Sequence, residues 1–246
     1  MAKFGTGNEG NRARIGVVVP SINIVFEAWS ARAVPEGVSV HTARMFIPDA
    51  LTKAGIIEMD RTDGMHAIRQ VATCRPAVIA YGCTASSIVQ GIDYDRHLRH
   101  EIETLSGGPA TTAAHAILTA LKAFGAGRIS AVSPYTAEID AAEHRFFEAA
   151  GLDVVGGACL GITDNFGLAA PSPETLFKLG VDGFDKRAEA LVITCLNTRS
   201  HTVIAALEEK LGVPVVTSTQ ATLWHALRLA GIKDLIAGAG RLLHLH

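Results

Sequence analysis

The sequence predicts an α/β protein of two pseudo-symmetric lobes, each a mostly parallel sheet flanked by helices. Short apolar runs alternate with longer amphipathic segments along the chain, which is typical of parallel α/β folds. Three stretches also recur in the same order at offsets of roughly 105 to 115 residues, which indicates an internal duplication. We therefore expect an N-terminal lobe over 14–125, a C-terminal lobe over 126–235 with a terminal helix open to exchange between them, and a flexible N-terminus over 1–13.

The strands are expected where short runs are dominated by β-branched and other apolar residues. The first run ends at Pro20 and is followed by a segment with helical periodicity. Two further helical segments each precede a glycine, Gly151 or Gly212, in the position of a C-cap. These rules place strands at 15–19, 78–80, 129–132, 191–193 and 213–216, and helices at about 25–33, 138–150 and 202–211.

The repeated stretches bring residues of the two halves into correspondence. RIGVVVPSINIV resembles RISAVSPYTAEI, which matches Pro20 with Pro134, and GGPATTAAHAILTALKAFGAGRI resembles GVPVVTSTQATLWHALRLAGIKDL. RPAVIAYGCTASSIV resembles AEALVITCLNTRSHTV, which matches Cys83 with Cys195. Ligands of open parallel sheets bind at the carboxyl ends of the strands, where both cysteines are placed. If the lobes pack about a pseudo-twofold axis, the two thiols meet in one cleft; the alternative is a duplication that preserved two core cysteines.

Composition excludes several classes of protein. The formal net charge is -2 and 48% of the residues are hydrophobic, so the chain is a globular protein without the charge of a nucleic-acid binder. No apolar stretch approaches the roughly 20 residues of a membrane-spanning helix, and the first residues lack the apolar region of a secretory signal. We therefore expect a cytoplasmic protein with no membrane and no nucleic-acid partner.

The cysteines are expected to be free thiols, because four in a chain of this length are too few for a disulfide scaffold. None pairs with another at metal-ligand spacing, and the histidines form no HExxH motif, so no metal is predicted. Cys74 and Cys159 have no counterpart in the repeat and are interpreted as ordinary thiols. Cys83 and Cys195 remain as the candidates for chemistry.

Cys83 stands in the stretch YGCTASS, where only small and hydroxyl residues follow it. A reactive thiolate needs a gap and bare backbone amides rather than bulky neighbours. A free thiol has a pKa of about 8.5, which unpaired N–H groups at a strand-to-helix turn would lower. We expect Thr84 to Ser87 to have this effect on Cys83, and Leu196 to Thr198 on Cys195. The same N–H groups can receive a substrate carboxylate.

Six short motifs occur in order along the chain: VVPSIN, YGCTASS, SPY, GITDN, TCLNTRS and GVPVVTS. From about Arg14 to Gly231 they resemble the aspartate/glutamate racemase superfamily, and within it the branch of maleate cis-trans isomerases and arylmalonate decarboxylases. The resemblance implies a cleft with one catalytic cysteine on each side, no metal, no organic cofactor and a homo-oligomer. Decarboxylases of this branch carry glycine where this sequence has Cys83, which argues against decarboxylation.

The resemblance also implies substrate-binding residues. It matches Asn23, Tyr135 and Asn165 with residues of the maleate isomerase motifs, although Ile22 departs from that pattern. Without the resemblance, the asparagines would be interpreted as turn or cap residues and the tyrosine as a core aromatic. Neighbouring positions of the same motifs complete the candidate set: Ser21, Thr84, Ala85, Leu196 and Asn197.

The function implied is cofactor-independent cis-trans isomerisation of a small dicarboxylate such as maleate, with Cys83 as nucleophile and Cys195 as acid and base. The alternatives are an amino-acid racemase that uses the thiols for two-base proton transfer, an arylmalonate-type decarboxylase, and a non-enzymatic protein that binds a small acid. The segment 45–65 mixes polar and apolar residues and is a candidate lid over the cleft.

Overall fold

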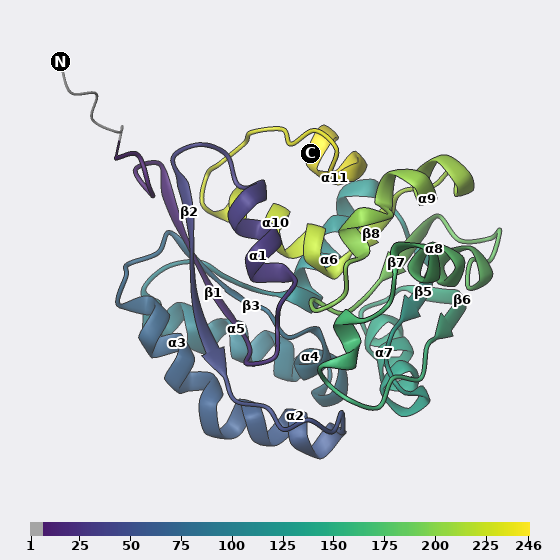
Figure 1. Cartoon of the computed structure of the whole chain (residues 1–246), viewed down its shortest axis with the longest axis horizontal. Helices are drawn as coiled ribbons and strands as arrows, with labels where there is room; N and C mark the ends of the chain where they lie inside the picture. Colours follow the sequence, from purple (N-terminus) through teal and green to yellow (C-terminus); the bar gives the residue numbers. More distant parts are fainter. Residues whose placement is uncertain (1–6) are drawn as a thin grey trace.

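Two four-stranded sheets form the framework of the computed structural model, which describes residues 7–246 (Figure 1). One sheet has the strand order β2-β1-β3-β4, the other β6-β5-β7-β8, and all neighbouring strands within each sheet are parallel. The two orders are the same once the second half is renumbered, as the internal repeat predicts. The α/β fold of two similar lobes is therefore confirmed.

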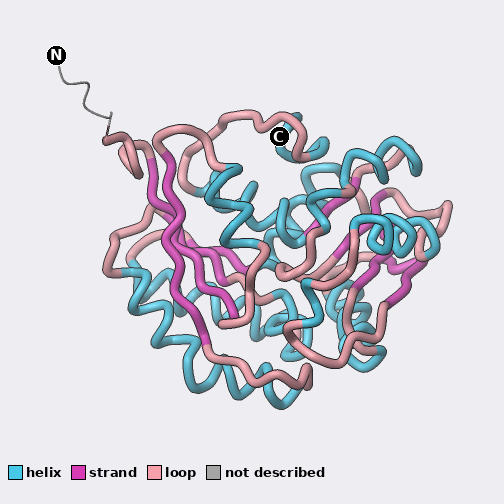
Figure 2. The backbone as a smooth tube through the Cα atoms, in the orientation of Figure 1, coloured by secondary structure: helices cyan, strands magenta, loops and turns pink. Residues whose placement is uncertain are grey.

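The strands of the first sheet are β1 (Ala13–Pro20), β2 (Val38–Met45), β3 (Val78–Tyr81) and β4 (Ala110–Thr112). Those of the second are β5 (Arg128–Ser133), β6 (Asp153–Cys159), β7 (Ala190–Ile193) and β8 (Val215–Thr217). Figure 2 shows them as two separate groups with helices around them. Each predicted strand lies within or beside an observed one, whereas β2, β4 and β6 were not predicted.

Helices connect successive strands and cover both sheets. The N-terminal half contains α1 (Phe26–Ala33), α2 (Lys53–Met59), a π-helical turn (Asp60–Gly64), α3 (Met65–Ala72), α4 (Thr84–Gln90), α5 (Ile92–Ser106) and α6 (Ala113–Phe124). The C-terminal half contains α7 (Ala137–Ala149), α8 (Pro173–Asp182), α9 (Ile204–Leu211), α10 (Ser218–Leu229) and α11 (Gly240–Leu245), with 3-10 turns at Gly167–Ala169 and Ser200–Thr202. Within residues 7–246, no helix has the length and apolarity needed to cross a bilayer.

The lobes meet through α6 and α10, which contact each other and the strands beside them. Both helices begin in the same way: the Thr112 hydroxyl accepts a hydrogen bond from the His115 amide, and the Thr217 hydroxyl accepts one from Gln220. Four of the buried residues of α6 are alanines, which add little bulk beyond the backbone and allow neighbouring elements to approach closely. The main apolar core therefore includes residues of both lobes, and a further cluster lies within the C-terminal lobe.

The loop after β2 crosses from the first lobe to the second, as the lower edge of Figure 2 shows. The Leu51 amide donates to the Thr163 carbonyl at 2.9 Å, and the Asn165 amide donates to the Asp49 carbonyl at 2.7 Å. Ala50 and Asp164 form an isolated antiparallel bridge between these contacts. The proposed lid segment 45–65 thus consists of this crossing loop, then α2 and the π-helical turn.

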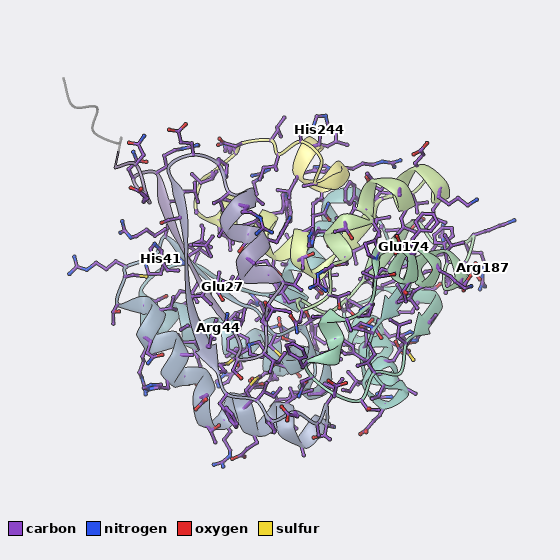
Figure 3. All side chains as sticks on the ribbon, viewed as in Figure 1. Glu27, His41, Arg44, Glu174, Arg187 and His244 are labelled. Atoms are coloured by element: carbon purple, nitrogen blue, oxygen red, sulfur yellow. The ribbon has the colours of Figure 1, made fainter. Side chains whose placement is uncertain are left out.

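An ion pair between Arg44 of β2 and Glu27 of α1 fixes the loop that follows β1 (Figure 3). The Arg44 guanidinium also donates to the Ser21 carbonyl at 2.8 Å and to the Asn23 carbonyl at 3.1 Å. The side chain therefore positions the VVPSIN motif from the edge strand. Of the predicted flexible terminus, residues 1–6 lie outside the described part of the chain, and Arg12 pairs with Asp234 at 2.6 Å.

The end of β7 holds an unusual backbone conformation. Cys195 has a φ of 80°, in the left-handed region where a non-glycine residue is strained by its own Cβ. Cys83, its counterpart after β3, has an ordinary extended φ of -128°. The left-handed conformation turns the chain away from the strand direction after Cys195. The two repeats are therefore similar in sequence at the cysteines but differ there in backbone conformation.

A buried carboxyl group lies behind Cys195. Glu143 of α7 is fully buried, and its Oε2 accepts a hydrogen bond from the Thr194 hydroxyl at 2.7 Å. Its Oε1 has no hydrogen-bond partner in the described residues. Burial raises the pKa of Glu143 well above its ordinary value, which makes the neutral acid the favoured form.

We expect a Cys195→Gly variant to be more stable than Cys195→Ala by about 1 kcal/mol, because only glycine adopts positive φ without strain. Both variants lack the thiol, so chemical denaturation compares the backbone effect alone. The matched control is the same pair at Cys83, where the extended φ removes the advantage of glycine. Equal stabilities at position 195, or a more stable alanine variant, would contradict the strained turn.

We expect Glu143→Gln to stabilise the fold increasingly as pH rises. The folded-state pKa of Glu143 is raised, so wild type loses stability as pH increases above the ordinary glutamate pKa, by up to about 1.4 kcal/mol per pH unit. Glutamine imitates the neutral acid and does not titrate. Thermal unfolding of both proteins between about pH 5 and pH 9 measures the difference, and a constant difference across that range would contradict a neutral Glu143.

Candidate active site

A small cavity lies where the carboxyl ends of the two sheets face each other. Its volume is about 40 Å³, and its residues come from both halves of the chain. One buried water occupies on the order of 10–15 Å³ on this scale, so the cavity accepts only a few groups of that size. It is lined by Pro20, Ile22, Asn23, Ile47, Leu51, Ile56, Gly82, Cys83, Thr84, Ala85, Tyr135, Asn165, Leu168, Cys195, Leu196 and Asn197.

Every candidate site residue of the sequence analysis except Ser21 lines this cavity, including both cysteines. The Ser21 hydroxyl instead accepts a hydrogen bond from the Ile47 amide at 3.3 Å, so it supports the cavity wall from behind. Cys74 and Cys159 are absent from the lining, in agreement with their interpretation as ordinary thiols. The structure thus brings together residues that lie more than a hundred positions apart in the sequence.

Gly82 allows Cys83 to reach the cavity. Its amide donates to the Val18 carbonyl at 2.6 Å, so the chain after β3 remains close to β1. A Cβ at this position would lie 2.7 Å from the Leu196 side chain and 2.9 Å from the Val18 carbonyl, closer than real contacts allow. Cys83 follows as the N-cap residue of α4. The predicted strand-to-helix turn with a thiol at its start is therefore present in the N-terminal lobe.

The expected helix end beside Cys195 is absent, because the residues after it form a loop and α9 begins only at Ile204. Individual donors take its place. Hydrogen bonds from the Thr198 hydroxyl, the Asn197 amide and the Tyr135 hydroxyl each lower the pKa of Cys195. The tyrosine of the SPY motif therefore lies close enough to the second thiol to stabilise its thiolate form.

Burial dominates the acidity of both thiols, which corrects the expectation of lowered pKa values. Burial, with a further contribution from the charge of Asp60, raises the pKa of Cys83 to about 12, and the nearby polar groups of Ser86 offset this only in part. Burial likewise raises the pKa of Cys195. Each thiolate lacks the water that would stabilise it, and the two thiols are close enough for Cys195 to raise the pKa of Cys83 further.

The three asparagines of the cavity differ in what their amides can still bind. Asn165 donates its Nδ2 to the Pro48 and Ala50 carbonyls at 2.7 and 3.2 Å. Asn197 accepts from the Ile24 amide at 2.9 Å and donates to the Ile22 carbonyl at 3.3 Å.

The side chains of Asn165 and Asn197 therefore join the two lobes. Asn23 instead uses its Oδ1 to accept from the Phe26 amide at 3.0 Å, as a helix cap does. Within the described part of the chain its Nδ2 has no acceptor and is available to a ligand, so the cap and ligand interpretations of Asn23 are compatible.

The apolar wall of the cavity was not predicted as part of the site. Ile47, Leu51 and Ile56 belong to the segment 45–65, which sequence analysis identified only as a candidate lid. Leu168 follows the GITDN motif by three positions. None of the lining residues carries a positive charge, so an anionic ligand would be held by neutral donors such as Asn23 Nδ2 and the Tyr135 hydroxyl.

Known proteins resemble this chain over most of its length. A maleate isomerase of Pseudomonas putida is 28% identical over 94% of this chain and 96% of its own length. An arylmalonate decarboxylase of Bordetella bronchiseptica is 27% identical over 88% of this chain and 90% of its own length.

The agreement extends to solved structures. The maleate isomerase Iso from Pseudomonas putida S16, in a cysteine-to-alanine variant with maleate, superposes with a TM-score of 0.89 at 25% identity, over 94% of this chain and 97% of that chain. The sequence profile of the arylmalonate decarboxylase family matches residues 35–243, which is most of the chain. On that match, the chain belongs to the arylmalonate decarboxylase family.

Proposed function

We propose that this protein is a maleate-isomerase-like enzyme that converts a small cis dicarboxylate into its trans isomer, with Cys83 as nucleophile and Cys195 as acid and base. The observation that carries the proposal is the pair of buried thiols, one from each lobe, in a single small cavity without charged groups. Relatives that cover nearly the whole chain are maleate isomerases, which supports this substrate class. The small cavity favours a four-carbon acid over an arylmalonate.

The reaction requires covalent catalysis because a double bond does not rotate. The Cys83 thiolate attacks one alkene carbon, and the electron pair of the double bond moves to the neighbouring carbon, which takes the proton of the Cys195 thiol. The new C–C single bond rotates. The Cys195 thiolate then removes a proton from that same carbon, the double bond re-forms, and Cys83 leaves as a thiolate.

Neutral donors hold the two carboxylates in this proposal. Asn23 offers its unused Nδ2, and the first amides of α4, at Thr84 and Ala85, have no partner within the helix. Leu196 and Asn197 line the same cavity, and their backbone amides are further candidate donors. Asn165 joins the binding set only if substrate displaces its bonds to the crossing loop, since both of its amide hydrogens are used.

The same two thiols would serve a racemase or a decarboxylase differently. Turnover of candidate acids in deuterated water separates the reactions. Conversion of maleate to fumarate supports the proposal, deuterium at the α-carbon of an amino acid supports racemisation, and release of carbon dioxide from an arylmalonate supports decarboxylation. Absence of any turnover would support a protein that only binds a small acid.

Removing each thiol is expected to stop the reaction at a different stage. Cys83→Ala should lose turnover and form no adduct, because no nucleophile is left. Cys195→Ser should accumulate maleate bound to Cys83, because water or the serine hydroxyl can protonate the carbon but serine is too weak a base to reverse the step. Intact-protein mass spectrometry followed by peptide mapping locates the adduct. Normal turnover in Cys83→Ala, or an adduct on Cys195, would exclude this order of events.

Tyr135→Phe is expected to reduce kcat by about 100-fold with little effect on stability, since it removes one donor to the charge that forms during the reaction. The Tyr135 hydroxyl donates to Cys195 and lowers the pKa of that thiol, so its loss destabilises the thiolate formed when Cys195 gives up its proton. Steady-state kinetics with maleate measure the effect. A change confined to KM would show that the hydroxyl only binds substrate.

A further inference from the structure

The loop that carries Asn23 depends on side chains for its conformation. Residues 21–24 lie between β1 and α1 and belong to neither a strand nor a helix. The helix start gives little support, because its N-cap residue, Val25, makes no side-chain hydrogen bond. Asn23 itself takes over that role when its Oδ1 accepts from the Phe26 amide at 3.0 Å. The backbone groups of the loop therefore need partners from elsewhere in the fold.

Arg44 supplies partners from within the N-terminal lobe. It lies on the edge strand β2, and its Nη1 donates to the Ser21 carbonyl at 2.8 Å and to the Asn23 carbonyl at 3.1 Å. Its Nη2 forms the ion pair with Glu27 of α1 (Figure 3). The planar guanidinium has its donors in a fixed arrangement, so the ion pair on one nitrogen orients the other nitrogen toward the loop. We call Arg44 and Glu27 together the loop clamp.

Asn197 supplies the remaining partners from the C-terminal lobe. Its Oδ1 accepts from the Ile24 amide at 2.9 Å, and its Nδ2 donates to the Ile22 carbonyl at 3.3 Å. Arg44 thus bonds the loop at positions 21 and 23, whereas Asn197 bonds it at positions 22 and 24. Of these two partners, only Asn197 has to part from the loop if the lobes separate, while the loop clamp stays within one lobe.

We propose that Arg44 is a positioning residue that sets the affinity for a substrate carboxylate through Asn23, and that Glu27 orients its guanidinium. Asn23 is 1% exposed and lines the cavity, whereas Arg44 does not line it. The inference rests on the proposed function for the identity of the ligand, since Asn23 Nδ2 is one of the neutral donors assigned to a carboxylate there. The loop clamp itself is present without substrate.

Geometry, not attraction by charge, is the contribution of Arg44. A hydrogen bond from Asn23 to a carboxylate spans roughly 2.7–3.2 Å, so a displacement of the loop by about 1 Å breaks it. The positive charge of Arg44 is offset by its partner Glu27, and the two side chains are 43% and 38% exposed. Solvent and salt screen charges that are this exposed. The loop clamp therefore acts by holding the Asn23 amide in place.

A double-mutant cycle tests whether Arg44 acts through Asn23. Calorimetry measures the Kd of maleate in a Cys83→Ala background, where no adduct can form. Arg44→Ala is expected to weaken binding about tenfold, because the Asn23 amide no longer faces the carboxylate. Adding Arg44→Ala to Asn23→Ala should change the Kd by less than about twofold, since no donor remains to be misplaced. Losses that multiply in the double variant would overturn the proposal.

Two further variants separate geometry from charge. Arg44→Lys keeps the positive charge but cannot hold two carbonyls and Glu27 in one plane, so maleate should bind about threefold more weakly or worse. Glu27→Ala leaves an unpaired cation near the cavity, which would tighten binding of an anion if attraction were the contribution. The loop clamp predicts weaker binding instead. Wild-type affinity in Arg44→Lys, or tighter binding in Glu27→Ala, would overturn it.

Arg12→Ala is the matched control. Arg12 also pairs with a carboxylate, Asp234, and donates to a backbone carbonyl, that of Glu36, at 3.2 Å. The exposed fractions of this pair, 42% and 35%, are close to those of Arg44 and Glu27. Neither residue lines the cavity, so maleate affinity should stay at the wild-type value. An equal loss in Arg12→Ala and Arg44→Ala would reduce the effect to general loosening and would overturn the proposal.

Hydrogen–deuterium exchange of the segment 20–26 without substrate separates this result from the proposed function. Faster exchange in Arg44→Ala and Glu27→Ala than in Arg12→Ala, with no isomerisation of maleate by wild type, would support the loop clamp and refute the isomerase. Unchanged exchange and unchanged maleate affinity in Arg44→Ala, with normal isomerisation by wild type, would refute the loop clamp and leave the isomerase in place.

Discussion

Hydrogen bonds from two asparagine side chains hold the lobes together around the cavity. Asn165 and Asn197 both belong to the C-terminal lobe, and both satisfy backbone groups in loops of the N-terminal lobe. Buried backbone groups without partners are costly, so these amides fix the loops as well as the distance between the sheets. The same hydrogen bonds therefore close the cavity and satisfy the backbone groups of the loops. A substrate that enters past the crossing loop has to replace some of them with hydrogen bonds to itself.

The resulting site is buried, and none of the residues that line the cavity carries a positive charge. Burial raises the pKa of both thiols, yet covalent addition needs one of them as a thiolate and the other as an acid. Identical surroundings would give two thiols of equal acidity. The carboxyls near them differ: Asp60 accepts hydrogen bonds from four side chains and lines a surface pocket, whereas Glu143 is fully buried and accepts one among the described residues. A duplicated framework thus supplies two chemically distinct cysteines.

Much of the fold was predictable because each half of the duplicated chain carries its own alternation of apolar strand runs and amphipathic helices. The central strands β1, β3, β5 and β7 are buried runs, and sequence analysis located all of them. The edge strands β2 and β6 have mixed burial, so their pattern is weak. The π-helical turn at Asp60–Gly64 was missed because its extra residue per turn leaves no distinct periodicity in five residues.

The sequence by itself determined the duplication, the α/β class and the pairing of Cys83 with Cys195, because these follow from order and spacing along the chain. Tertiary structure alone decided which asparagines have free amide hydrogens, that Cys195 occupies a strained turn in place of a helix start, and that a buried Asp60 accepts hydrogen bonds from Ser86 and Gln90 of α4. The physical reason is that acidity and hydrogen-bond capacity depend on the partners a side chain meets in space. Those partners come from segments whose separation in the sequence gives no indication of contact.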